Sequence, residues 1–254
     1  MQQKFEVRVI SLHNQLERRV LMAQRLDEVF AWQFFDAIAG SEISHETKFY
    51  DREKRLKIFG YDMRINEIAC FMSHRKVWEQ CAASQKNFLI LEDDVKIALD
   101  PTEMKLKDVF DGLAEQLGRR GIIRLGNSGI RTEKKRIVDF NSIYSLYRYR
   151  RDPLGAFAYF LSPEVAKELL KYSSHVFTPV DDFLWRGWEH QCSLIDIAPN
   201  LFFTSDMENP STIGDRSKPK IGFLQKMKRE YFRAFDVFDR KIYEKKIINE
   251  LIDK

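Results

Sequence analysis

The pattern of apolar and polar residues predicts alternating strands and helices along most of the chain. Residues 4–12 alternate apolar and polar positions before becoming wholly apolar, as a strand does when it enters a core. A helix capped by Asn14 should follow, and residues 32–38 read as a second strand. The positions of this helix expected to face the core are Leu16, Val20, Ala23 and Leu26. Strand, helix and strand within about 35 residues form a βαβ unit, so a parallel sheet is the expected architecture.

The centre of the chain combines a long helix with a strand that ends in acid. Residues 65–84 have one apolar face and predict a helix that leads directly into the next strand. Residues 88–91 are four adjacent apolar side chains, which read as a strand buried on both faces. In open α/β sheets, ligands bind beyond the carboxyl ends of such strands.

Three consecutive carboxylates, Glu92, Asp93 and Asp94, stand at that end. Since side chains alternate along an extended chain, Glu92 and Asp94 can point the same way while Asp93 points to the other side. Two hard oxygen ligands on one side suit Mg²⁺ or Mn²⁺, which often bind through one or two carboxylates and a substrate phosphate. A solvated acidic turn, or a cap for a following helix, explains the same residues.

The second half of the chain continues with shorter elements. Residues 104–117 read as an amphipathic helix, residues 131–141 as an exposed polar excursion, and residues 178–190 as one helix. A serine and a proline begin a further helix over residues 162–173. Short strands are expected at residues 122–125, 142–149, 156–161, 192–198 and 201–204.

The last segment differs in charge from the rest. Residues 216–254 hold 12 Lys and Arg against 6 Asp and Glu, a local charge of +6 in a chain whose net charge is +4. The apolar residues that form a stripe at helical spacing there are Leu224, Met227, Tyr231, Phe235, Phe238 and Ile242. We therefore expect one domain over residues 1–214 and a basic amphipathic helical extension over residues 215–254. The stripe either packs this helix on the domain or lets residues 219–254 lie on a membrane surface with anionic lipid.

Composition narrows the possible classes of protein. The 254 residues are 44% hydrophobic and 31% charged, as in soluble globular proteins. We expect a cytoplasmic location, because the first residues do not resemble a signal peptide and no apolar run approaches the roughly 20 residues of a membrane span. Three cysteines without a CxxC spacing argue against disulfide scaffolds and thiolate zinc sites. HExxH, GxGxxG and P-loop motifs are absent from the sequence.

Six segments occur in an order that resembles glycosyltransferase family 25, the lipopolysaccharide galactosyltransferase-like enzymes. The segments are V-I-S-L-x4-E-R-R at 9–19, F-F-D-A-I-A-G at 34–40, N-E-I-A-C-F-M-S-H-x3-W at 66–78, I-L-E-D-D-V at 90–95, G-A-F-A-Y at 155–159 and P-V-D-D at 179–182. The resemblance covers residues 7–214. It implies a GT-A-like, Rossmann-type α/β fold, with a mixed and mainly parallel sheet flanked by helices. It also implies a UDP-sugar donor, with UDP-galactose expected, and inversion at the anomeric carbon.

The resemblance further implies a divalent metal, Mn²⁺ or Mg²⁺, on the donor diphosphate. The family's acidic DxD-type motif reads Glu92-Asp93-Asp94 here, with glutamate at its first position. We expect Asp94 to be the direct metal ligand and Glu92 a metal or ribose partner, while Asp93 holds the metal through water or fixes the strand end. The other donor-binding candidates are Ser11, Arg18, Arg19, Ser73, His74, Asn127 and Gly155.

Inversion needs a general base that takes the proton from the acceptor hydroxyl on the face opposite UDP. Asp181 and Asp182 are the candidates, because they follow the Gly-Ala strand in the family order and stand at a helix start whose dipole keeps a carboxylate ionised. Asp181, the aspartate of the Pro-Val-Asp segment, is preferred. One of the two is expected to serve only as a cap for that helix.

The resulting functional hypothesis is an inverting β-galactosyltransferase. It would transfer a hexose to a lipid-linked lipooligosaccharide or lipopolysaccharide acceptor at the inner face of the inner membrane. A metal-dependent phosphoesterase would use the same carboxylates to activate water. A non-catalytic saccharide or nucleic-acid binding module would use the basic tail, although we do not expect a nucleic-acid partner.

Overall fold

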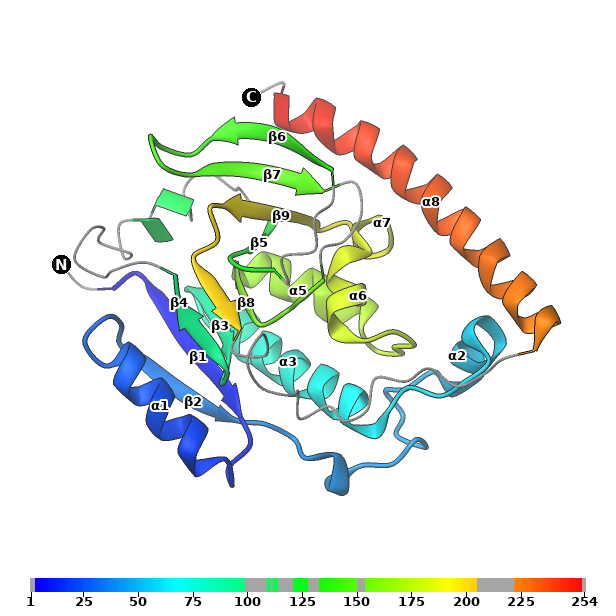
Figure 1. Cartoon of the computed structure of the whole chain (residues 1–254), viewed down its shortest axis with the longest axis horizontal. Coiled ribbons are helices and arrows are strands. Elements are labelled where there is room, and N and C mark those ends of the chain that lie inside the picture. The colour runs from blue at the N-terminus through cyan, green and yellow to red at the C-terminus, as the bar shows by residue number, and fades with distance from the viewer. Residues whose placement is uncertain are drawn as a thin grey trace.

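A mixed sheet is the centre of the fold. The computed structural model describes residues 3–98, 109–110, 112–113, 121–127, 133–149, 154–204 and 222–252. Within these residues, eight strands form one sheet in the order β2-β1-β3-β8-β5-β9-β7-β6, and two more strands, β4 and β10, pair separately (Figure 1). Helices cover both faces of the large sheet.

The strands and helices have the following bounds. The strands of the large sheet are β1 (Phe5–Ser11), β2 (Trp32–Asp36), β3 (Asn87–Glu92), β5 (Gly121–Arg124), β6 (Lys134–Asp139), β7 (Ser145–Tyr149), β8 (Ala158–Leu161) and β9 (Ser193–Ala198). The separate pair is β4 (Val95–Ile97) with β10 (Phe202–Thr204). The helices are α1 (Leu16–Leu26), the 3-10 turn η1 (Gly40–Glu42), α2 (Arg52–Phe59), α3 (Ile65–Ala83), α5 (Pro163–Tyr172), α6 (Val180–Trp185), α7 (Gly187–His190) and α8 (Phe223–Ile252).

Strand directions confirm the predicted βαβ unit and the mixed sheet. β1 pairs in parallel with both β2 and β3. β8 lies antiparallel between β3 and β5, and β7 lies antiparallel between β9 and β6. Six of the eight described strands of the sheet therefore run one way, while β7 and β8 run the other. The finer GT-A assignment stays a prediction.

The acidic strand β3 is buried on both faces, as predicted. Phe88 and Ile90 belong to a core cluster formed with α3, α5 and α6, whereas Leu89 and Leu91 belong to a second cluster formed with α1. None of these four side chains is more than 1% exposed. Because both faces are covered, the carboxyl end of β3 is where polar side chains can meet a ligand.

The predicted inner face of α1 is correct at Leu26 and wrong at Leu16 and Val20. Leu16 and Val20 are 68% and 56% exposed, and the buried residues are Met22 and Leu26. The predicted cap is also wrong, since Gln15 occupies the cap position. The first turn of α1 lies over the polar end of β1, where its arginines pair with acidic groups, so apolar contact begins only in the second turn.

Three other predicted segments differ from the structure. The predicted excursion at residues 131–141 contains the edge strand β6, whose polar, exposed sequence hides its pairing with β7. The single helix predicted over residues 178–190 is divided at Arg186 into α6 and α7. The predicted helix at 104–117 falls mostly outside the described residues, of which 109–110 and 112–113 are helical.

A buried ion pair joins two neighbouring strands of the sheet. Arg124 of β5 and Asp196 of β9 are direct partners in the parallel register, and each side chain is 1% exposed. The guanidinium donates from Nε to Oδ1 at 2.7 Å and from Nη2 to Oδ2 at 3.0 Å. Removing one partner of such a pair leaves a buried charge without compensation.

We expect Asp196→Ala to lower the free energy of unfolding by about 3–5 kcal/mol, because Arg124 would stay buried without its carboxylate. Denaturant unfolding followed by circular dichroism measures the loss. The matched control is Asp139→Ala, which removes the exposed partner of Arg136 on β6 and should cost less than about 1 kcal/mol. If Asp196→Ala and Asp139→Ala lowered the free energy of unfolding equally, the Arg124–Asp196 pair would not be the stabilising buried ion pair described above.

Candidate functional site

A cavity of about 180 Å³ lies at the carboxyl ends of β1 and β3. Its wall comes from the two strand ends, the start of α1, the segment after β2 and one face of α3. The predicted site residues in this wall are Ser11, Arg18, Ser73, His74, Glu92, Asp93 and Asp94. The fold thus gathers side chains that are up to 83 positions apart in the sequence around one hollow.

Asp93 is held in place by two partners. Ser11 Oγ donates to its Oδ2 at 2.7 Å, and Arg18 Nη1 donates to its Oδ1 at 2.9 Å. Both carboxylate oxygens are therefore engaged by neighbouring elements, and the Asp93 charge is offset by Arg18. Glu92 instead points to the α3 side, where it meets His74. The two neighbouring carboxylates diverge, as strand alternation predicts.

A chain of buried hydrogen bonds positions Glu92. Trp78 Nε1 donates to the Tyr159 hydroxyl at 2.8 Å, that hydroxyl contacts His74 Nδ1 at 2.8 Å, and His74 Nε2 contacts Glu92 Oε1 at 3.2 Å. An ionised carboxylate only accepts, so His74 Nε2 carries the proton and Nδ1 accepts from the hydroxyl. Burial raises the pKa of Tyr159 well above its ordinary value, which keeps that hydroxyl protonated.

Cys70, His74 and Glu92 form a second candidate set of metal ligands. One ligand atom from each of the three lies within 4.8 Å of the others. Sulfur and nitrogen donors are typical of zinc, whereas Mg²⁺ and Mn²⁺ prefer the carboxylate oxygens that Glu92 and Asp94 bring to the same cavity. The two donor sets share Glu92 and differ in chemistry, so metal preference distinguishes them.

Neither Asp181 nor Asp182, the two predicted bases, is among the residues that line this cavity. The Cys70 thiol lies in the cavity wall. Its pKa is raised mainly by burial and, to a smaller extent, by the negative charges of Glu92 and Asp181. The charge of Asp182 instead acts on Arg186, on the α7 side. Both aspartates stand in the first turn of α6 and are partly buried, and Asp181 Oδ1 accepts from the backbone N–H of Asp182 at 2.8 Å.

Ser73 and Arg19 make contacts that hold neighbouring elements together. Ser73 Oγ donates to the Ala69 carbonyl at 2.8 Å and accepts from the Ile38 N–H at 2.9 Å, which ties α3 to the segment after β2. Arg19 donates to the Ser11 carbonyl at 3.0 Å and pairs with Asp36, whose pKa it lowers by hydrogen bonding. Ser73 also lines the cavity, whereas Arg19 does not.

Asn127 and Gly155 lie together beyond the ends of β5 and β8, outside the cavity wall. Asn127 donates to Asp196 at 3.5 Å, and the Gly155 carbonyl accepts from Arg124 at 3.4 Å. Gly155 has a φ of +104°, a backbone conformation that favours glycine. Both residues thus contact the buried ion pair of Arg124 and Asp196. Their predicted binding of the sugar-nucleotide donor stays a prediction.

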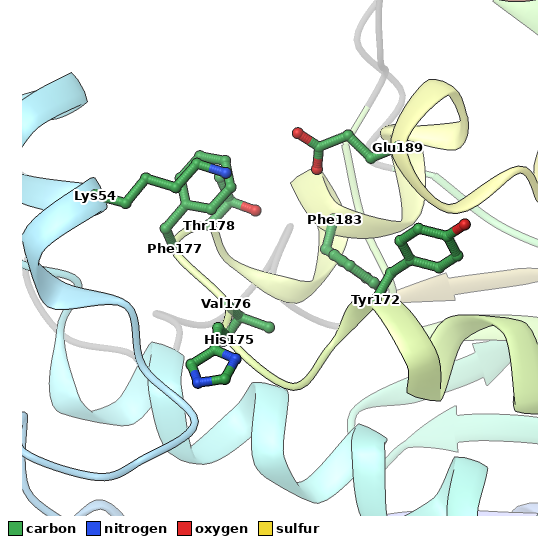
Figure 2. Close-up of a pocket in the computed structure, with 8 residues that line it drawn as sticks. All are labelled: Lys54, Tyr172, His175, Val176, Phe177, Thr178, Phe183 and Glu189. Carbon is green, nitrogen blue, oxygen red and sulfur yellow. The ribbon is translucent and has the colours of Figure 1, made fainter.

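A second cavity, of about 190 Å³, lies between α2, the segment after α5, and α6 and α7 (Figure 2). Lys54 and Phe177 both line this cavity, and Lys54 Nζ lies 3.7 Å from the centre of the Phe177 ring. The other lining residues are Tyr172, His175, Val176, Thr178, Phe183 and Glu189. None of the predicted site residues lines this cavity, so the acidic cavity is the candidate site.

Four buried polar residues near the site were missed by the sequence interpretation. Trp78 and Tyr159 have side chains that read as core, and their hydrogen bonds depend on tertiary contacts. Arg124 and Asp196 carry a signal that was available: each is a charged residue inside an otherwise apolar strand. A charge in such a strand is rarely buried without a partner.

A comparison with protein-family models matches the part of the chain that forms the acidic cavity. The model described as glycosyltransferase family 25 (LPS biosynthesis protein) matches residues 4–184, which include every residue of the acidic cavity wall. The chain belongs to glycosyltransferase family 25. The match ends within α6, so α7, β9, β10 and α8 lie outside the family model.

Individual family members share just over a quarter of the matched positions. A glycosyltransferase 25 family member of Anopheles gambiae is 28% identical over 186 residues, 69% of this chain and 30% of the relative. A member of the same name in Aedes aegypti is 28% identical over 188 residues, again 69% and 30%. The inactive glycosyltransferase 25 family member 3 of Mus musculus is 28% identical over 189 residues, 70% and 31%. The chain spans about 30% of the length of these relatives, and one of them is named inactive.

No helix in the described parts of the chain combines the length and the apolarity needed to cross a bilayer.

We expect Tyr159→Phe to lower the free energy of unfolding by about 1–3 kcal/mol, because it leaves the buried Trp78 N–H and His74 Nδ1 without their partner. Denaturant unfolding measures this loss. Tyr172→Phe, at a residue 46% exposed, is the control and should change stability by less than about 0.5 kcal/mol. In ¹⁵N spectra of the wild type, a His74 ring protonated at Nδ1 alone would contradict the proposed direction of the hydrogen bonds.

Proposed function

We propose that this chain is an inverting glycosyltransferase that transfers a hexose from a UDP-sugar to a saccharide acceptor. The observation that carries the proposal is the acidic cavity at the end of β3, lined by Glu92, Asp93 and Asp94. It lies within the residues matched by the family model. Galactose as the sugar, and a lipid-linked oligosaccharide as the acceptor, follow from the family resemblance and belong to the same proposal. The cytoplasmic location stays a prediction from the sequence.

The charges of the cavity wall support a metal-assisted donor site. Three carboxylates line it against one arginine, Arg18, which already pairs with Asp93. A diphosphate would be repelled by the remaining carboxylates, Glu92 and Asp94, unless a cation lay between them. Their oxygens are the ligands that Mg²⁺ and Mn²⁺ prefer. When bound, such a cation stabilises the negative charge that develops on the UDP leaving group.

The surrounding residues support this site in two ways. Ser11 and Arg18 hold the Asp93 side chain in the turn after β3 by hydrogen bonds to both of its carboxylate oxygens. The His74 hydrogen bond fixes the rotamer of Glu92 from a fully buried ring. Ligands held by neighbouring hydrogen bonds lose little freedom when they bind a metal.

The general base in this proposal is Asp181. Neither aspartate lines the cavity, but the charge of Asp181 acts on Cys70 in the cavity wall, whereas that of Asp182 acts on Arg186. The carboxylate would take the proton of the acceptor hydroxyl as that oxygen bonds to the anomeric carbon and the bond to UDP breaks. The start of α6 stabilises the ionised form that this step needs.

We expect Asp94→Ala to reduce kcat/KM for a UDP-sugar by at least about 100-fold, because the donor diphosphate loses a metal ligand. Release of UDP measures the rate with Mn²⁺, with Zn²⁺ and after chelation, and Mn²⁺ should restore activity to the chelated wild type. Asp239→Ala, an exposed acid of α8, is the control. Near-normal turnover by a folded Asp94→Ala chain would overturn the metal assignment, and a preference for Zn²⁺ would favour the Cys70 cluster.

We expect Asp181→Asn to reduce kcat by about 100- to 10,000-fold while the KM for the donor changes little, because proton removal is lost and donor binding is kept. Asp182→Asn is the matched control at the adjacent position and should retain most of the activity. If both variants kept the wild-type kcat, the base would lie elsewhere.

A further inference from the structure

Helix α8 presents a long apolar surface to solvent. Its large apolar side chains that are 41% to 75% exposed are Phe223, Leu224, Met227, Tyr231, Phe235, Val237, Phe238 and Ile242. Six of these recur at intervals of three or four residues from Leu224 to Ile242, so they lie on one face of the helix. We call this face the α8 stripe. Soluble monomers rarely expose a contiguous apolar patch of this length without a partner.

The opposite face of α8 attaches the helix to the rest of the protein. Gln225 Nε2 donates to the Leu56 and Lys57 carbonyls of α2 at 3.2 and 3.0 Å. Farther along, Asp236 accepts from Arg186 at 2.6 and 2.8 Å. The sequence left open whether the stripe packs the helix on the domain or faces a membrane. The helix does pack on the domain, but through these polar residues, and the stripe stays outside.

Arg186 and Tyr243 make this attachment firm. Burial opposes the charge of Arg186, but its hydrogen bonds to Asp236 and Glu189 raise its pKa above the ordinary value. The Tyr243 side chain is 6% exposed and its hydroxyl lies 3.3 Å from Ser193 Oγ. A side chain at Gly187 would meet the Tyr243 ring at 2.8 Å, which shows how closely α7 and α8 approach. The direction in which the stripe faces is thus fixed by contacts near both ends of the helix.

Cations border the stripe. Lys226, Lys228, Lys241 and Lys245 are exposed on the same helix. Of the α8 acids whose side chains the structure describes, Asp236 faces Arg186, Glu230 is bridged by Arg229 and Arg233 at 3.2 and 2.9 Å, and Asp239 is exposed. The segment 216–254 carries 12 Lys and Arg against 6 Asp and Glu. A positive border around aromatic and aliphatic side chains complements an anionic lipid surface.

We propose that the α8 stripe is a membrane-docking surface, which lies in the plane of a bilayer that contains anionic lipid. The helix runs along the outer edge of the molecule, from beside α2 toward β6 (Figure 1). A second copy of the chain is the other apolar partner to consider. Pairing two stripes would bring two positive borders together, which costs energy, whereas anionic headgroups attract them. The proposal goes beyond the proposed sugar transfer and does not depend on it.

The test is cosedimentation of the full chain with vesicles of phosphatidylcholine, with and without phosphatidylglycerol, and without any UDP-sugar. We expect binding to the anionic vesicles that weakens as salt is raised. Phe235→Ser combined with Phe238→Ser should reduce the partition constant roughly tenfold or more. Lys228→Gln combined with Lys241→Gln should reduce it roughly thirtyfold on anionic vesicles. All four residues are exposed, so the fold should be kept, and circular dichroism melts check this.

Leu16→Ser combined with Val20→Ser is the matched control, because these α1 residues are equally exposed and outside α8. It should bind like the wild type. Equal binding by the Phe235/Phe238 variant, or no binding by the wild type, would overturn the proposal. The proposal would also be overturned if light scattering showed a wild-type dimer and the Phe235/Phe238 variant were monomeric. The stripe would then be an interface between two copies of the chain. An inactive chain that still binds vesicles would contradict the sugar transfer alone.

Discussion

The burial of β3 on both faces is the constraint on which the candidate site depends. With helices on each side, only the carboxyl end of the strand is open to polar chemistry, and three carboxylates follow one another there. Their side chains bind different partners, which separates two of the three negative charges from each other. Asp93 turns to Arg18 and Glu92 to His74. A tightly packed strand thus delivers charges of defined direction to one cavity.

Buried polar groups extend this order into the core. The chain from Trp78 to Glu92 has a defined donor at each step, because an indole only donates and an ionised carboxylate only accepts. On the next strands, the Arg124–Asp196 pair lies between two apolar layers. Each of these groups would destabilise the fold if it stood alone. Their mutual satisfaction therefore specifies the strand register and the position of the site together.

Helix α8 shows how one amphipathic element can serve two surroundings. Its polar face is fastened to α2 and α7, so the apolar face that usually turns to a core is turned away from it. In water this orientation of α8 leaves apolar surface exposed, which is unfavourable. The helix also lies outside the part of the chain that the family model matches. The acidic cavity, by contrast, is lined entirely by residues that the family model matches.

The sequence by itself determined the βαβ start, the doubly buried β3, the acidic strand end and the family, because these depend on local periodicity and on motifs in order. It wrongly assigned Leu16 and Val20 of α1 to the core and missed the edge strand β6, since both depend on which element packs opposite. Only the tertiary structure left Asn127 and Asp181 out of the cavity wall and turned the α8 stripe outward. The reason is physical: a side chain's type is local, but its partner is chosen by packing between distant elements.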